Sequence, residues 1–242
     1  MTGVQTCALP IYSLRPNEVF IRLCEESGCP LLQTGLSSSD FSARIIRALS
    51  NVFAPKETIH GVLVEVFGIG ILIRGDSGVG KSETALELIE RGHRLVADDA
   101  VEIRCVSGNI LLGSGANKVI GHHMEIRGLG IINITHLFGV GAIRDKKQIQ
   151  LVVELEHWES DKDYDRIGSQ DVTTEILGVQ IPYLKIPVKP GRNVPILIET
   201  AAMNERLKEM GYYSAKEFNQ SVLKWLESEN ARTVYLQNTD LY

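Results

Sequence analysis

Residues 75–82, "GDSGVGKS", fit the pattern G-x-x-x-x-G-K-[ST] of a phosphate-binding loop. An apolar, β-rich run leads directly into Gly75, and the segment "KSETALELIERG" that follows has apolar residues at helical spacing. A strand that passes through a glycine-rich turn into a helix directs backbone N–H groups and the helix N-terminus toward an anion. This order constrains the fold more than any other feature, because it requires a strand and a helix side by side in an α/β domain.

The residue types within this loop indicate separate tasks. Lys81 supplies a point charge for the β- and γ-phosphates of ATP, and Ser82 supplies a hydroxyl for Mg²⁺ or Mn²⁺. A Rossmann dinucleotide site is not indicated, because no G-x-G-x-x-G follows a strand. The expected nucleotide-binding residues are Gly75, Asp76, Ser77, Gly78, Val79, Gly80, Lys81 and Ser82.

Phosphoryl transfer also needs a carboxylate, and "RLVADDA" places Asp98 and Asp99 at the end of an apolar run. Neighbouring residues of an extended chain point to opposite sides. We therefore expect only one of the two carboxylates to face the transferred group, unless the strand has already ended. A surface turn is the alternative for this pair.

Hydrophobic spacing and turn residues predict the other elements. The order of elements predicts an α/β fold with a mixed β-sheet and helices at the C-terminus. The predicted elements are helices at residues 17–26, 41–54, 81–92, 200–210 and 214–228, a strand and turn at 30–37, a hairpin at 61–75 joined by Gly-Ile-Gly, one or two strands at 93–105, a glycine-broken apolar segment at 125–134, a strand at 149–158, and a proline-rich loop with a strand at 185–200.

Three regions are expected along the chain. Residues 1–11, "MTGVQTCALPI", resemble a translated cloning adapter and are expected to be a non-native leader. Residues 12–55 are too few to make a convincing core alone and are expected to be part of a second domain. Residues 56–242 are expected to form the phosphate-binding domain.

Charge and cysteine content exclude several classes of protein. The chain has 25 basic and 30 acidic residues and no basic run, which disfavours nucleic-acid binding. Four cysteines in 242 residues do not indicate a disulfide framework, and no second pair accompanies Cys24 and Cys29 as zinc ligands would require. No secretory signal or membrane-spanning run is visible. A cytoplasmic protein is expected.

Several motifs in a fixed order resemble bacterial HPr kinase/phosphorylase. The stretch from "GDSGVGKS" through "RLVADDAVEIR" is followed by "EIRGLGIIN", "YDRIG" at 164–168 and "PVKPGRN" at 187–193, and "IHG" precedes the hairpin. The resemblance covers residues from about 12 to about 230, so it is far more specific than a phosphate loop alone. It implies a bifunctional enzyme that phosphorylates a serine of the phosphocarrier HPr with ATP. The same enzyme removes that phosphate with inorganic phosphate and releases pyrophosphate.

The resemblance also implies a nucleotide domain similar to that of phosphoenolpyruvate carboxykinase, a homo-hexamer, and a set of site residues. Its implied catalytic residues are His60, Lys81, Asp99 and Arg166, with Asp99 as the base in the kinase direction and the acid in the reverse. Its implied metal ligands are Ser82 and Glu125, with Asp98 as a further candidate. The segment 124–133, with Glu125, Arg127, Gly128 and Gly130, matches a signature needed for both reactions, and Lys189, Pro190, Gly191 and Arg192 match a loop tied to dephosphorylation.

Two departures from the family pattern and two alternative functions remain. Lys189 stands where many members have Arg, which removes bidentate geometry. Residues 12–55 match only the last part of the family's N-terminal domain, so a truncated domain is expected. The alternatives are a small-molecule or carboxykinase-like kinase on the same scaffold, and a nucleotide-gated binding module without catalysis.

Overall fold

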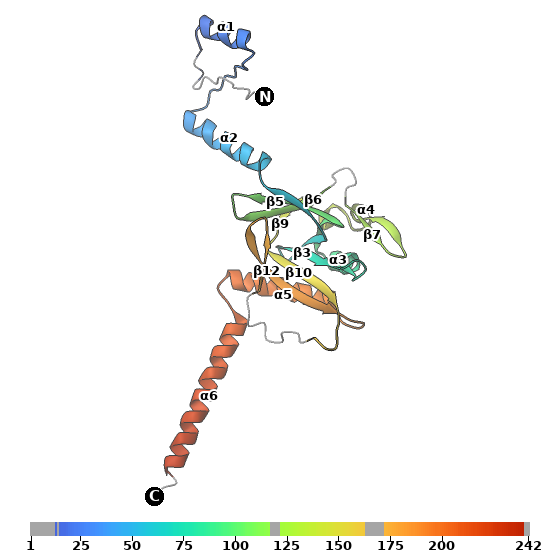
Figure 1. The fold of residues 1–242 in the computed structure, drawn as a ribbon. Coiled ribbons are helices and arrows are strands. Elements are labelled where there is room, and N and C mark those ends of the chain that lie inside the picture. The colour runs from blue at the N-terminus through green and yellow to red at the C-terminus, as the bar shows by residue number, and fades with distance from the viewer. Residues whose placement is uncertain (1–12, 14, 117–121, 163–171, 240–242) are drawn as a thin grey trace. The chain divides into compact units, whose positions relative to one another are not determined.

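The computed structural model describes residues 13, 15–116, 122–162 and 172–239 (Figure 1). The chain divides into two compact units, Met1–Ala54 and Pro55–Tyr242. No helix in the described ranges combines the length and the apolar character that crossing a bilayer requires.

The first unit contains two helices, α1 (Glu18–Ser27) and α2 (Ser38–Val52). Each begins after a side chain that accepts a backbone N–H: Asn17 caps α1 and Ser37 caps α2. The strand predicted at residues 30–37 is wrong, since no strand element forms between the two helices. The serine-rich end of that segment serves as the cap of α2 instead.

The second unit contains the sheets and the remaining helices. Its strands are β1 (Lys56–His60), β2 (Val62–Val66), β3 (Ile69–Gly75), β4 (Arg94–Ala97), β5 (Ala100–Val106), β6 (Ile110–Gly115), β7 (His123–Ile126), β8 (Gly130–Asn133), β9 (Lys146–Gln148), β10 (Leu151–His157), β11 (Thr173–Ile176) and β12 (Val179–Val188). Its helices are α3 (Lys81–Glu90), α4 (Ile134–Phe138), the 3₁₀ turn η1 (Val140–Ala142), α5 (Val194–Glu209) and α6 (Ser214–Thr239). The predicted α/β class with a mixed sheet is confirmed.

A six-stranded sheet with the order β11-β12-β10-β3-β2-β4 carries the phosphate loop. Strands β3, β10 and β12 run parallel to one another. Strand β4 has the same direction as β3, because both are antiparallel to β2. The carboxyl ends of β12, β10, β3 and β4 therefore meet at one edge of the sheet, where ligands of open α/β sheets bind.

The two faces of this sheet are buried against different partners. Ile71 and Ile73 of β3 join a core with Leu88 of α3 and Ile198 of α5. Leu72, between them in sequence, faces the opposite side and joins a core with residues of β5 and β6. Those two strands belong to a four-stranded sheet with the order β1-β5-β6-β9. Helices, a large sheet and a small sheet thus form three layers, and complete burial of a leucine such as Leu88 stabilises them by about 1.5–3 kcal/mol.

The predicted hairpin is confirmed, but its turn is one residue earlier than Gly-Ile-Gly. Val66 pairs with Ile69, so the turn consists of Phe67 and Gly68. Both have positive φ, 48° and 85°, which is the geometry that matches the twist of a two-residue hairpin.

The strand predicted within residues 185–200 lies earlier in the chain than expected, since β12 ends at Val188. The segment "PILIET", residues 195–200, is helical instead. Asn193 accepts the backbone N–H of Ile196 at 3.1 Å, and a proline stands in the first turn of α5. The helix predicted at 200–210 is the second half of α5. Helix α6 extends beyond the predicted 214–228.

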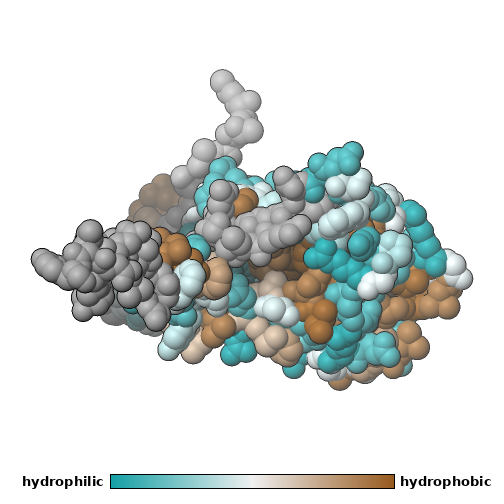
Figure 2. Space-filling model, turned by 90° about the horizontal axis from the view of Figure 1, so that it is seen from below, coloured by the Kyte–Doolittle hydropathy of each residue, from teal (hydrophilic) through white to brown (hydrophobic). Residues whose placement is uncertain are grey.

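Hydrophobic residues also reach the surface. Figure 2 shows them among hydrophilic residues on the face seen from below. Ile196, Met203 and Leu207 of α5 are between 42% and 49% exposed, whereas Phe218 and Trp225 of α6 are 58% and 61% exposed. The part of α6 whose side chains are described, residues 214–228, therefore does not bury an apolar face against the other described residues.

Candidate active site

The phosphate-loop segment connects a strand to a helix, in the order that its sequence predicts. It leaves β3 at Gly75 and enters α3 at Lys81, with Gly80 at the helix N-cap in a left-handed conformation. A Cβ atom at Gly75 would collide with the carbonyl oxygen of Leu155 on the neighbouring strand β10. Only glycine fits there, which explains the first invariant position of the motif in physical terms.

The ammonium group of Lys81 folds back over the loop. Its Nζ donates to the carbonyl oxygens of Gly75 at 2.8 Å and Asp76 at 2.9 Å. Backbone carbonyls hold the charge without neutralising it, so Lys81 remains available to an anion that enters the loop.

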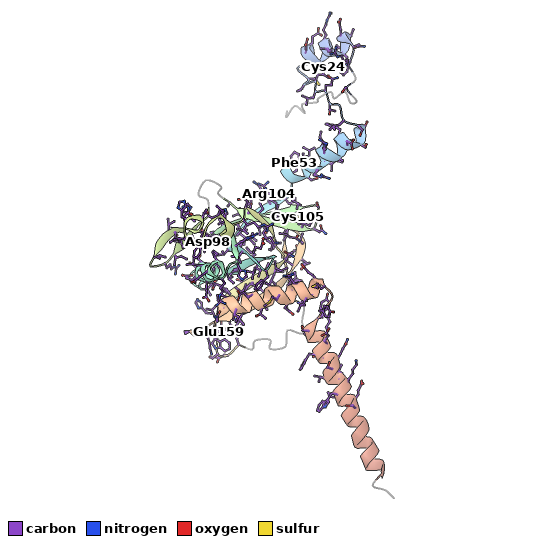
Figure 3. The ribbon with its side chains drawn as sticks, turned by 180° about the vertical axis from the view of Figure 1, so that it is seen from behind. Cys24, Phe53, Asp98, Arg104, Cys105 and Glu159 are labelled. Carbon is purple, nitrogen blue, oxygen red and sulfur yellow. The ribbon has the colours of Figure 1, made fainter. Side chains whose placement is uncertain are left out.

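Ser82 and Asp98 meet at the first turn of α3. The Ser82 hydroxyl donates to Oδ1 of Asp98 at 3.0 Å. Asp98 follows the last residue of β4 and lies among the side chains beside α3 (Figure 3). Burial raises the pKa of the Asp98 carboxyl above its ordinary value, although hydrogen bonds from Ser82 and from the backbone N–H groups of Asp99 and Glu125 act in the opposite direction.

Asp99 differs from its neighbour in conformation and exposure. The strand has already ended at Ala97, and Asp99 adopts φ 67°, in the left-handed region. Its side chain is 85% exposed, and Oδ1 lies 3.5 Å from Nδ1 of His60, which is equally exposed. The structure therefore gives the two aspartates different surroundings: Asp98 bonds to the phosphate-loop serine, whereas Asp99 stands beside a histidine in open solvent.

A cavity of about 830 Å³ brings these groups together. Lys81, Ser82, Asp98 and Asp99 line it, and so does Glu125 from the hairpin of β7 and β8. This volume is within the range of ligand sites, about 300–1,000 Å³. The cavity thus joins the phosphate loop, two aspartates and a third carboxylate that are far apart in sequence.

Arg127 connects the signature segment to the phosphate loop. Its Nη2 donates to the Ser77 hydroxyl at 3.0 Å. A Cβ atom at Gly78 would stand 2.7 Å from Nη1 of Arg127, so the absence of a side chain at Gly78 makes room for the guanidinium. Gly128 and Gly130, at the turn of the hairpin, have positive φ of 84° and 91°. The hairpin thereby places a second cation in the lining of the cavity that Lys81 also lines.

The remaining candidates are not among the described residues that line this cavity. Arg166 lies outside the described residues. Lys189, Pro190, Gly191 and Arg192 form a turn between β12 and α5 and do not line the cavity. The Lys189 ammonium lies 5.0 Å from the centre of the Trp158 ring. This turn stands at the carboxyl end of β12, on the same edge of the sheet as the phosphate loop.

Several cavity residues had no role in the sequence analysis, among them His122 and Asp145. His122 and Asp145 both line the cavity, with Nε2 and Oδ1 3.8 Å apart. The position of His122 next to the signature segment could have indicated it. Asp145 has no such signal, because only the fold brings the segment after η1 to this site.

Three oxygen ligands fit a divalent cation at the loop. Ser82, Asp98 and Glu125 offer one hydroxyl and two carboxylates, the hard oxygen donors that Mg²⁺ prefers. Asp98 is also a partly buried carboxylate that forms no ion pair with a described residue, and a metal ion would compensate its charge. Among the residues with described positions, no group of three or more His, Cys, Asp or Glu side chains is arranged to hold a metal ion by itself, so the Ser82 hydroxyl is needed to complete this set.

Comparison with known proteins gives a consistent result. The family described as "HPr Serine kinase C-terminal domain" matches residues 51–222. A protein of Treponema pallidum (strain Nichols), "HPr kinase/phosphorylase", is 64% identical over 236 residues, which cover 98% of this chain and 74% of that protein. A protein of Leptospira biflexa serovar Patoc (strain Patoc 1 / Ames) with the same description is 52% identical over 229 residues, which cover 94% of this chain and 71% of that protein.

A solved structure is similar as well. It is the "Hpr(Ser) kinase/phosphatase from Coxiella burnetii", with 37% sequence identity and a TM-score of 0.60. The similarity covers 67% of this chain and 98% of that one.

Proposed function

This chain belongs to the HPr kinase/phosphorylase family, and we propose that the cavity at its phosphate loop performs both family reactions at one site. In the kinase direction, a serine oxygen of HPr bonds to the γ-phosphorus of ATP, the bond to the bridging oxygen breaks, and ADP leaves. In phosphorolysis, an oxygen of inorganic phosphate bonds to the phosphorus of phosphoserine, the serine oxygen leaves, and pyrophosphate forms. One observation carries the proposal: the phosphate-loop hydroxyl of Ser82 is hydrogen-bonded to Asp98 in a cavity that also contains Asp99.

The surroundings of each residue indicate its role in the two reactions. Lys81 and the backbone N–H groups of the loop bind the β- and γ-phosphates, or the pyrophosphate product. Ser82, Asp98 and Glu125 hold the divalent cation, which supplies a positive charge against the charge of the phosphoryl oxygens. Asp99, exposed at the cavity, takes the proton of the attacking serine, and in the reverse reaction gives one to the leaving serine.

His60 and Arg127 have supporting roles. His60 lies beside Asp99 and orients its carboxylate. Arg127 stabilises the loop through Ser77 and adds a second positive charge near the phosphates. We assign Arg166 to the phosphate oxygens as well, on the resemblance of "YDRIG" alone.

Further features of the proposal rest on the family resemblance. They are Mg²⁺ or Mn²⁺ as the metal, a nucleotide domain similar to that of phosphoenolpyruvate carboxykinase, a homo-hexamer, and action in the cytoplasm. The regulation of sugar uptake and of carbon catabolite repression would follow from the phosphorylation state of HPr.

Incubation with ATP, Mg²⁺ and HPr is expected to add about 80 daltons to a serine of HPr, the mass of one phosphoryl group. Subsequent addition of excess inorganic phosphate, after removal of ATP, is expected to reverse the gain and release pyrophosphate. Intact-protein mass spectrometry measures the first step and a pyrophosphate assay the second. An unmodified HPr in the presence of bound nucleotide would contradict the proposal and favour a binding module.

The loop from Lys189 to Arg192 yields a selective prediction. Free phosphate lacks the adenosine that helps to hold ATP, so its binding depends more on individual cations. We expect Lys189→Ala and Arg192→Ala to lower the rate of phosphorolysis about tenfold or more while changing the kinase rate less than threefold, in line with the loss of one charged hydrogen bond. Both rates would be measured on each variant.

Lys56→Ala is the matched control, because Lys56 is an exposed lysine of β1 paired only with Glu102 at 3.5 Å in the described contacts. It should change neither rate. Equal losses in both directions for the loop variants would remove the assignment of this loop to phosphorolysis.

A further inference from the structure

The phosphate loop stands in the middle of the sheet edge at which the strands end. Along that edge the order is β12, β10, β3, β2 and β4, and the loop follows β3. Ser82 and Asp98 lie on the side of β4, so the metal-binding and reacting end of a bound polyphosphate points that way. The other end of a nucleotide must then extend from the loop toward β10 and β12.

A second cavity, of about 420 Å³, is present on that side. Arg74 and Asp76 line it from the start of the phosphate loop, and Glu154, Glu156, Tyr183 and Lys185 line it from β10 and β12. None of these six residues lines the first cavity. The two cavities therefore flank the phosphate loop, with the reacting groups confined to one of them.

We propose that this second cavity binds the adenosine part of ATP, with Glu154 as an acceptor for the ribose hydroxyls and Tyr183 against the nucleoside. The proposal rests on the proposed function, because it extends the same nucleotide across the same loop. It goes further by naming residues that contact ATP but not pyrophosphate when either one donates the phosphoryl group.

The chemistry of the cavity suits a neutral, hydroxyl-rich group rather than another phosphate. Glu154 lies 3.5 Å from Arg74 and is 25% exposed, so an oxygen remains open to a hydroxyl donor. Glu156 is paired with Lys162 at 2.6 Å, and its Oε1 is buried without a hydrogen bond among the described residues. The lining has three carboxylates, Asp76, Glu154 and Glu156, and two cations, Arg74 and Lys185. The excess of negative charge disfavours a further anion, whereas carboxylates accept hydrogen bonds from ribose hydroxyls.

Tyr183 adds a surface for the nucleoside. Burial, and then the nearby Glu154, raises the pKa of the Tyr183 phenol above its ordinary value, so its hydroxyl keeps its proton at neutral pH. The ring packs partly against the core shared by the two sheets, which fixes its position. A rigid aromatic ring with a donor at its tip combines an apolar contact with a directed hydrogen bond.

Phosphorolysis run in reverse provides the test, because pyrophosphate then donates a phosphoryl group to HPr without any adenosine. Glu154→Gln removes the charge and keeps the shape, and it should raise the KM for ATP about tenfold, as expected for one lost hydrogen bond to a charged group. With pyrophosphate as donor, its KM should stay within about twofold of the unchanged protein. Thr173→Trp, at an exposed position of β11 that lines the cavity, should fill the space and raise the KM for ATP at least as much.

Glu175→Gln is the matched control, because Glu175 is an exposed carboxylate of β11 outside the cavity. It should leave both KM values unchanged. If Glu154→Gln raised the KM for ATP and the KM for pyrophosphate equally, the substitution would act on the phosphate loop through Arg74, and the proposal would be overturned. Unchanged KM values for both donors in Glu154→Gln and Thr173→Trp would also overturn it.

Calorimetric titrations with ADP and pyrophosphate provide a readout that does not need catalysis. Glu154→Gln should weaken ADP binding about tenfold and leave pyrophosphate binding unchanged; equal affinities of the two proteins for ADP would overturn the proposal. If the unchanged protein failed to modify HPr with either donor, the proposed function would fail, and the titrations would still decide the adenosine site separately.

Discussion

Lys81→Ala is expected to lower both the kinase and the phosphorolysis rate by at least about 10²-fold while the fold stays intact. ATP and pyrophosphate would occupy the same loop and present the same charge to the same ammonium group. Loss of a preorganised cation at the developing phosphate charge has a cost of this order. The rates in both directions would be measured together with the thermal midpoint of unfolding.

The local contacts of Lys81 support an intact fold in this variant. Its Nζ donates only to the carbonyl oxygens of Gly75 and Asp76 in the described contacts, and the side chain is not part of either hydrophobic core. Lys81→Arg is the matched control: it retains the charge but not the compact point-charge geometry, so it should recover part of the activity. Near-normal phosphorolysis in Lys81→Ala would contradict a shared site.

The phosphate loop was predictable because its information is local. Eight consecutive residues contain the glycines, the lysine and the hydroxyl group. Apolar residues form a continuous run before the loop, as in a buried strand, and recur at helical spacing after it. The structure adds the reason for two glycines: Gly75 faces the backbone of β10 and Gly78 faces Arg127. Neither contact could be inferred from the sequence, since both partners are distant along the chain.

The prediction of a strand at the end of residues 185–200 was wrong because the amino-acid composition there favours a strand, whereas a helix N-cap precedes it. The β-branched residues of "PILIET" favour a strand, but the Asn193 cap and the proline at the first turn begin a helix there. Burial of Ile198 against the sheet then stabilises that helix. Tertiary packing outweighed intrinsic propensity at this point.

The relation between the two aspartates also depended on the fold. The sequence placed both at the end of a strand and left open which one faces the site. Strand β4 ends at Ala97 and Asp99 takes a left-handed conformation. As a result both residues line the cavity, with Asp98 against Ser82 and Asp99 against His60.

This difference in surroundings predicts different consequences for the two amide variants. Asp98→Asn should raise the Mg²⁺ concentration needed for half-maximal activity, because the proposed metal site loses one charged ligand, while some turnover remains at saturating metal. Asp99→Asn should lower both rates at every metal concentration, because an amide cannot accept the serine proton or return it. General acid–base catalysis contributes about 10²–10⁴-fold, which sets the size of the loss. Asp161→Asn, an exposed aspartate that lines neither active-site cavity, is the matched control.

The proposed role of Asp99 as base and acid predicts opposite pH responses for the two directions. Phosphorylation requires the ionised carboxylate, which is lost as the pH falls, whereas phosphorolysis requires the protonated form, which is lost as the pH rises. The ratio of the phosphorolysis rate to the kinase rate should therefore increase as the pH is lowered from about 8.5 to about 5.5. In Asp99→Asn the residual rates should lose this opposition. Identical pH profiles in both directions for the unchanged protein would exclude Asp99 as a shared acid and base, since one group cannot supply and remove a proton in the same ionisation state.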